Sequence, residues 1–120
     1  MTALVNTTRG TTLADNVESP SRRAGALLGL MGRAALRPGA CFLLPGTRGV
    51  QTHFMRFSID AVFLDQSLVV LRIVRGLRPW RMAGRRGAKA VLELAAGAAD
   101  RGRLGEGDRL ILGAERAAAA

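Results

Sequence analysis

The segment from His53 to Asp60 holds the residue types in this chain that are best able to do chemistry. His53 is the only histidine, so any histidine-dependent acid–base step near neutral pH must use it. An enzyme that uses His53 with Asp60 and a histidine held structurally by hydrogen bonds both stay open. If the segment is a strand, its side chains alternate between two faces, with His53, Met55 and Phe57 on one and Phe54, Arg56 and Ser58 on the other.

Arg56 and Asp60 carry opposite charges four residues apart and share the same strand parity. A chain corner at Ser58 would let the two side chains approach each other. Charged groups among so many apolar neighbours must be paired or face water. Two interpretations follow: an arginine that binds an anionic ligand and is oriented by Asp60, or a structural ion pair.

A second group of candidates is the basic stretch around the only tryptophan, where Arg78 and Arg81 flank Trp80. Arginines beside an aromatic residue suit phosphate contact and base stacking. No helix-turn-helix, zinc-finger or RNA-motif pattern accompanies them, so we expect nucleic-acid binding to be at most weak and non-specific. We predict instead that Trp80 packs against the protein. The candidate ligand-binding residues are therefore His53, Met55, Arg56, Asp60, Arg78, Trp80 and Arg81.

Other motifs predict no catalytic residue, metal site or cofactor. Cys41 lies in the apolar run Ala40–Leu44, where burial as a small hydrophobic residue is expected rather than nucleophilic use. The histidine, cysteine and acidic residues show no metal-ligand spacing. The glycines of Gly105–Asp108 lack the lysine and the strand-to-helix context of a phosphate loop, and indicate a tight turn.

Composition indicates one small basic domain. The 120 residues are 48% hydrophobic and carry a net charge of +9, with seventeen arginines and one lysine. We expect a single domain over residues 1–113 and a frayed tail over 114–120. The single cysteine suits a reducing compartment, and the sequence shows no signal peptide or membrane span, so we expect a cytoplasmic protein.

The pattern of short apolar runs and turn residues predicts an α+β fold that is mostly β. We expect a small barrel-like antiparallel or mixed sheet with one or two short helices. The predicted strands are a hairpin over Ala3–Leu13, then Cys41–Leu44, Gln51–Leu64, Leu68–Val74, Ala88–Leu94 and Arg109–Leu112. The predicted helices are Arg22–Arg33 and Ala95–Leu104, and Gly76–Gly87 is expected to be an irregular loop.

Three blocks of sequence resemble a known family: Gly29-Leu30-Met31-Gly32-Arg33, the run from His53 to Asp60, and the run from Ala90 to Gly97 followed by Leu104 to Leu110. On these blocks the chain resembles the prokaryotic family called domain of unknown function 192. The resemblance implies a compact bacterial β-rich domain without an assigned activity. We expect a non-enzymatic binding or accessory module for an anionic small ligand or an acidic protein. A weak nucleic-acid binder, or an enzyme of unknown type using His53 and Asp60, are the alternatives.

Overall fold

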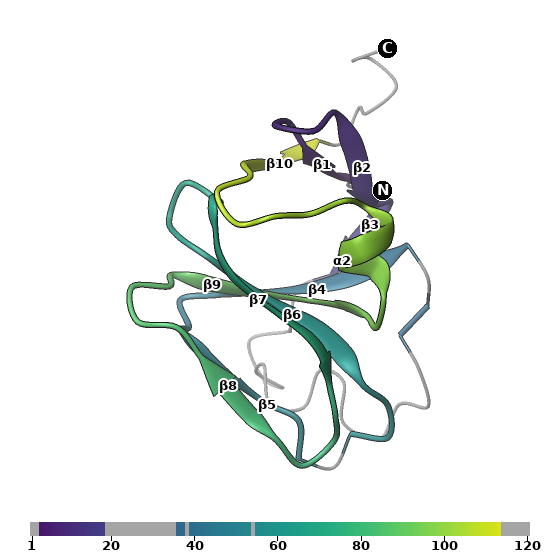
Figure 1. The fold of residues 1–120 in the computed structure, drawn as a ribbon, viewed down its shortest axis with the longest axis vertical. Helices are drawn as coiled ribbons and strands as arrows, with labels where there is room; N and C mark the ends of the chain where they lie inside the picture. The colour runs from purple at the N-terminus through teal and green to yellow at the C-terminus, as the bar shows by residue number, and fades with distance from the viewer. Residues whose placement is uncertain (1–2, 19–35, 38, 54, 114–120) are drawn as a thin grey trace.

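The computed structural model describes residues 3–18, 36–37, 39–53 and 55–113. This part of the chain is mostly β, with one short helix, α2 (Ala98–Arg101), which confirms the predicted class (Figure 1). The strands, in chain order, are β1 (Ala3–Asn6), β2 (Thr11–Ala14), β3 (Asn16–Glu18), β4 (Ala40–Pro45), β5 (Gly49–Gln51), β6 (Ile59–Leu64), β7 (Val70–Leu77), β8 (Met82–Gly84), β9 (Ala90–Ala95) and β10 (Leu110–Gly113).

The described strands form three separate sheets. Their strand orders are β10-β1-β2, β3-β4-β9-β6-β7 and β5-β8. Pairing is antiparallel except between β3 and β4, which run parallel. The five-stranded sheet ends at β3 and β7, which do not pair with each other, so the described strands close no barrel and the barrel-like arrangement is not confirmed.

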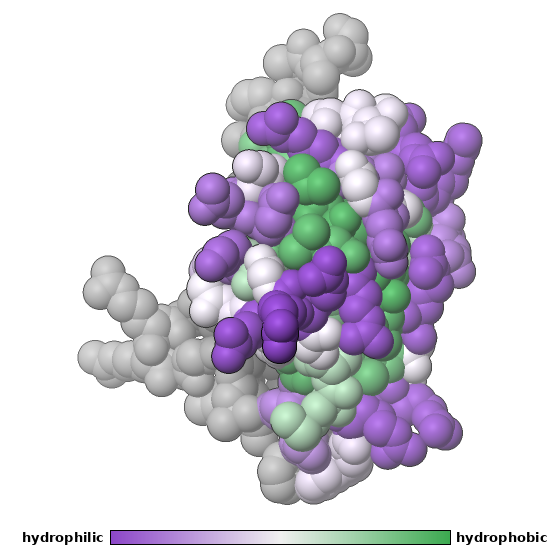
Figure 2. Space-filling model, turned by 60° about the vertical axis from the view of Figure 1, so that its left-hand side comes forward, coloured by the Kyte–Doolittle hydropathy of each residue, from purple (hydrophilic) through white to green (hydrophobic). Residues whose placement is uncertain are grey.

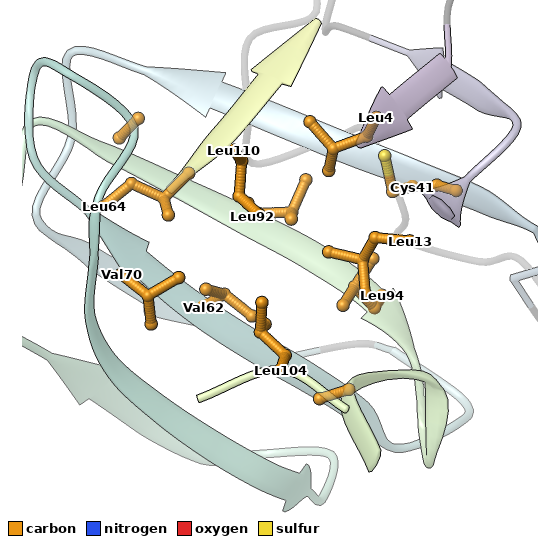
Figure 3. Packing of buried hydrophobic residues seen from close by; sticks show 13 residues of the cluster. Leu4, Leu13, Cys41, Val62, Leu64, Val70, Leu92, Leu94, Leu104 and Leu110 are labelled. Carbon is orange, nitrogen blue, oxygen red and sulfur yellow. The ribbon is translucent and has the colours of Figure 1, made fainter. Parts of the chain in front are cut away.

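The three-stranded sheet and α2 cover one face of the five-stranded sheet (Figure 1). Side chains from both layers meet there, and Figure 3 shows Leu4 and Leu110 gathered over Leu92 and Leu94. Strand β6 is buried along its whole length, as expected for a strand covered on both faces. We call the five-stranded sheet the frame, because this first core packs on one of its faces.

A second core lies on the opposite face of the same sheet. Phe42, Phe63 and Val91 of the sheet pack there with Val50 of β5 and with Met55. Ala83 of β8 packs against the edge of this cluster. The small β5–β8 sheet is therefore attached to the frame through Val50 and Ala83, while Met82 of β8 is exposed at the surface.

Several sequence predictions are confirmed because local signals determine them. The first hairpin turns at Gly10, and the last turn passes through Gly107; both have positive φ, which glycine adopts without steric cost. Strand β4 ends at Pro45 as predicted, and β9 and β10 lie within or next to their expected ranges. The second helix is present but is shorter than expected.

Two predictions about the middle of the chain are wrong. Gln51–Leu64 is not one strand: β5 ends at Gln51, β6 begins at Ile59, and no strand covers the residues described between them. The alternating faces assigned to His53–Ser58 therefore do not exist. The range Gly76–Gly87 is not entirely irregular, because β8 within it pairs with β5.

The predicted helix over Arg22–Arg33 and the tail over 114–120 lie outside the described residues. Within the described ranges, the helix found is far too short to cross a bilayer.

Candidate functional site

Asp60 stands apart from the other candidate residues and is almost fully buried at the start of β6. Its Oδ1 accepts the backbone N–H of Gly76 at 2.9 Å, and its Oδ2 accepts those of Gly97 and Ala99, both at 3.0 Å. The carboxylate thus joins β6 to β7 and caps the first turn of α2. Asp60 has a structural role in positioning these elements.

The predicted pairing of Arg56 with Asp60 is not formed. Arg56 is exposed, and no ion pair joins these two residues in the described part of the chain. The physical reason is that three backbone N–H groups already satisfy both oxygens of Asp60. Neither an Arg–Asp ligand clamp nor a His53–Asp60 acid–base pair is supported by this arrangement.

His53 and Trp80 are brought together. Their ring centroids lie 5.2 Å apart with planes inclined by 66°, so the contact is edge-to-face. His53 is half-buried, and its backbone N–H donates to Oε1 of Gln51 at 2.6 Å. Trp80 remains 54% exposed. The prediction that Trp80 packs against the protein is therefore confirmed only in part: the ring contacts His53, while more than half of the residue's surface stays exposed.

Thr52 organises this site, although sequence reasoning did not single it out. It is fully buried, and its hydroxyl bonds to the carbonyl oxygens of Arg78 at 2.6 Å and Arg81 at 3.1 Å. The hydroxyl also accepts the N–H of Arg81 at 2.8 Å. The backbone N–H of Thr52 donates to the carbonyl oxygen of Arg81 at 2.9 Å, and the carbonyl oxygen of Thr52 accepts the N–H of Trp80 at 3.0 Å. One residue thus fixes the whole Arg78–Arg81 turn.

The backbone of Trp80 has φ +63°, in the left-handed region that bulky residues rarely adopt. This conformation costs on the order of 1–2 kcal/mol. The hydrogen bonds of Thr52 on both sides of Trp80 hold it in place. Non-glycine residues in such conformations are concentrated at functional sites, so this conformation marks Trp80 as a candidate functional residue.

The remaining candidates divide into buried and exposed groups. Met55 is buried in the second core, so its side chain is not available to a ligand. Arg78 and Arg81 are exposed on either side of Trp80. Met82, which sequence reasoning missed, is 75% exposed at the start of β8. The sequence feature that could have identified Met82 is its position two residues after the tryptophan in an arginine-rich segment.

We call residues 46–53 and 78–89 the basic arm; it contains β5 and β8. The arm has no aspartate or glutamate, and its basic residues are Arg48, Arg78, Arg81, Arg85, Arg86 and Lys89. All six are exposed, and none takes part in an ion pair with any described residue. Figure 2 shows strongly hydrophilic side chains over much of this side of the molecule, around a paler, weakly hydrophobic area near its lower end.

Besides Asp60, three acidic or thiol groups outside the arm are buried. Cys41 is fully buried, as predicted, and this burial, with added effects of Glu18 and Asp15, raises the pKa of its thiol to about 12, which disfavours the thiolate. Burial raises the pKa of Glu93 to about 7. Burial also acts to raise the pKa of Asp108, but hydrogen bonds from Asn6, Gly105 and Arg9 and the charge of Arg9 outweigh it and lower that pKa.

No three His, Cys, Asp or Glu side chains gather closely enough to hold a metal ion within the described ranges. The chemistry that this surface does offer is non-covalent: a half-exposed indole, a thioether and several guanidinium groups. These groups suit the binding of an anionic partner.

Comparisons with known proteins agree with the fold. A structure from Sinorhizobium meliloti 1021, named as a proposed transcription regulator, is 22% identical with a TM-score of 0.73, covering 92% of this chain and 91% of that one. A protein of unknown function from Novosphingobium aromaticivorans DSM 12444 is 20% identical with a TM-score of 0.70, covering 92% and 82%. No curated protein matches significantly. The model of DUF192, described as an uncharacterized ACR, matches residues 4–112, and the chain belongs to this family.

Proposed function

We propose that this protein is a non-enzymatic binding module that recognises an acidic protein segment through the Trp80 end of its basic arm. The observation that carries the proposal is the presentation of Trp80, which is more than half exposed yet fixed by the buried Thr52. A large aromatic residue whose backbone is already held by hydrogen bonds loses less entropy on binding than one on a free loop. Tryptophan, methionine and arginine are also the residues most enriched at protein interfaces.

Charge supports an acidic partner. Arg78 and Arg81 flank the indole, and the arm contains no acidic side chain that would neutralise them. A partner bearing carboxylates around an apolar residue would complement both the apolar centre and the basic rim. The positive electrostatic potential of these arginines would also steer such a partner toward the arm before contact.

The exposed shape of this end favours a protein segment over a small ligand. Trp80 and Met82 stand out with more than half of their surfaces exposed, whereas small-ligand sites are concave and enclose most of the ligand. Side chains that project from a surface suit insertion between the side chains of a partner. We therefore assign the Trp80 end to a protein partner.

Calorimetry with a synthetic peptide in which Glu and Leu alternate tests this proposal. A peptide in which Gly replaces Leu measures the contribution of charge alone. Trp80→Ala should weaken binding of the Glu-Leu peptide about tenfold or more. It should change binding of the Glu-Gly peptide much less.

Arg109→Gln is the matched control for loss of charge, because Arg109 is exposed outside the arm. The double variant Arg78→Gln/Arg81→Gln should weaken binding of both peptides more than this control does. Equal affinity of the Trp80→Ala and parent proteins for the Glu-Leu peptide would overturn the proposal.

Single-stranded nucleic acid is a second candidate, and the exposed ring of Trp80 favours it. An exposed indole beside arginines can stack on a base and contact its phosphate. The Sinorhizobium meliloti structure is named as a proposed transcription regulator, although that similarity is one of fold. Oligothymidylate binding that falls steeply with salt and is lost in Trp80→Ala would favour this candidate over the acidic protein.

We place this binding function in a reducing compartment such as the bacterial cytoplasm. The support is Cys41, the only cysteine, which is fully buried and unpaired. Localisation of the fluorescently tagged protein in a bacterial host tests this assignment, and export from the cytoplasm would contradict it.

A further inference from the structure

The end of the basic arm opposite Trp80 forms an open hollow of about 400 Å³. It is lined by Arg48, Gly49, Gly84, Arg85 and Arg86. Gly49 and Gly84 are directly paired across β5 and β8, at the end of β8 that leads toward β9 (Figure 1). This position is separate from the Trp80 turn, which joins the other end of β8.

A second hollow, of about 540 Å³, adjoins the first because both are lined by Arg48. Its other lining residues are Gly46, Thr47, Ala88 and Lys89. The two hollows together therefore present three guanidinium groups and one ammonium group, and Arg48 stands between them. Their combined lining contains no carboxylate.

Backbone contacts fix this end of the arm. The N–H of Arg85 donates to the carbonyl of Arg48 at 3.0 Å, and the N–H of Gly46 donates to the carbonyl of Lys89 at 2.8 Å. The guanidinium of Arg72, on β7, donates to the carbonyl of Gly84 at 2.7 Å and so ties the hollow to the five-stranded sheet. The hollow is thus part of a hydrogen-bonded frame.

Glycine at position 84 keeps this arrangement open. A Cβ atom added there would lie 3.2 Å from the carbonyl oxygen of Arg48, which is tighter than ordinary contact. At Gly49 an added Cβ would lie 3.5 Å from the carbonyl oxygen of Ala83. Backbone without side chains in a basic hollow lets a ligand approach the main chain closely.

We propose that the hollow of Arg48, Arg85 and Arg86 binds a phosphate group, and that the adjoining hollow with Lys89 receives a second phosphate of the same ligand. A phosphate offers three acceptor oxygens and up to two negative charges, so it can satisfy several guanidinium groups at once. A single carboxylate brings one negative charge, which leaves part of this donor set unmatched, whereas two phosphates of one ligand bring at least two charges, one to each hollow. Binding also relieves the mutual repulsion of the arginines.

This inference goes beyond the proposed function and does not depend on it, because it uses neither Trp80 nor Met82. The same phosphate chemistry has two sources: a small phosphorylated molecule or the backbone of a nucleic acid. Pyrophosphate represents the first source. Oligothymidylate represents the second, because successive phosphodiesters would then occupy the two hollows.

Calorimetry of the full chain with pyrophosphate tests the site. The double variant Arg85→Gln/Arg86→Gln should lower pyrophosphate affinity about tenfold or more. Arg101→Gln/Arg109→Gln removes the same charge at exposed positions outside the arm and should leave affinity within about threefold of the parent. Circular dichroism of each variant confirms that the fold is retained.

Each possible outcome is decisive. Selective loss in the hollow variant supports the site. If oligothymidylate binding is lost in the same variant and pyrophosphate competes for it, the phosphate belongs to a nucleic-acid backbone; if pyrophosphate alone binds, the ligand is a small phosphorylated molecule. Equal losses in both double variants, or no pyrophosphate binding to the parent, overturn the proposal. Trp80→Ala should leave pyrophosphate binding unchanged, so failure of the acidic-partner proposal is measured separately.

Discussion

Replacing Glu93 with glutamine should stabilise the protein in a strongly pH-dependent way. Glu93 lies on β9 in the middle of the five-stranded sheet, 5% exposed, with Phe42 and Ala61 as its cross-strand neighbours. No described residue forms a hydrogen bond or an ion pair with its carboxyl group. Burial without a partner disfavours the charged form and raises its pKa from 4.5 to about 7.

The sign and size of the effect follow from linkage. Below pH 4.5 the carboxyl is protonated in both folded and unfolded chains, and it adds no pH dependence. Between pH 4.5 and about 7 the unfolded chain loses a proton that the folded chain keeps, so stability falls as pH rises. The total loss is about 3 kcal/mol and is complete above pH 7. Glu93→Gln has no such loss.

Urea unfolding of the parent and Glu93→Gln proteins, followed by far-ultraviolet circular dichroism, measures this difference. The stability of Glu93→Gln relative to the parent should rise by about 3 kcal/mol between the acid and alkaline ends of that range. Glu106→Gln, which removes an exposed carboxylate from a turn, is the control and should show a much smaller change. A relative stability of Glu93→Gln that stays constant across this pH range would refute the reasoning.

Three further substitutions test the structural groups that position the arm and its frame. The pKa of Asp108 is lowered in the folded chain, so its carboxylate stabilises the fold above its ordinary pKa of 3.8, and this stability is lost as pH falls through the folded-state pKa. Asp108→Asn should therefore flatten the acid limb of the curve of stability against pH. An acid limb that is unchanged in this variant would contradict the reasoning. Asp60→Asn should cost about 2–4 kcal/mol in urea unfolding, because an amide cannot accept all three backbone N–H groups, and a loss below about 1 kcal/mol would show that those bonds matter little. Thr52→Val should cost about 1–3 kcal/mol and raise hydrogen exchange at the Arg81 amide, which loses its hydroxyl acceptor; unchanged exchange there would argue against Thr52 as the organising residue.

The sequence predicts the parts of the fold that local chemistry determines. Glycines at turn positions, Pro45 at the end of β4 and the apolar run of β9 each act over a few residues. The limits of β5 and β8 depend on pairing between segments some thirty residues apart. Strands of three residues carry little signal of their own, so the pairing partner decides whether they form.

The candidate site could be predicted only in part, because some of its contacts join residues far apart in the sequence. His53, Trp80 and the flanking arginines do lie together. Asp60 was assigned to Arg56 because sequence reasoning pairs side chains with side chains, whereas its actual partners are backbone N–H groups 16, 37 and 39 residues away. Threonine at position 52 has no local signature, since its importance comes from contacts with a distant turn.

The central claim is that Trp80 anchors an acidic partner, and the indole N–H resonance of Trp80 tests it most directly. The protein has one tryptophan, so its ¹⁵N-labelled form gives a single indole signal. Titration with the alternating Glu-Leu peptide should shift this signal together with the backbone amides of Arg78 and Arg81. Shifts that gather instead on the exposed residues Ile111 and Leu112 of β10, with the indole signal unmoved, would contradict the claim.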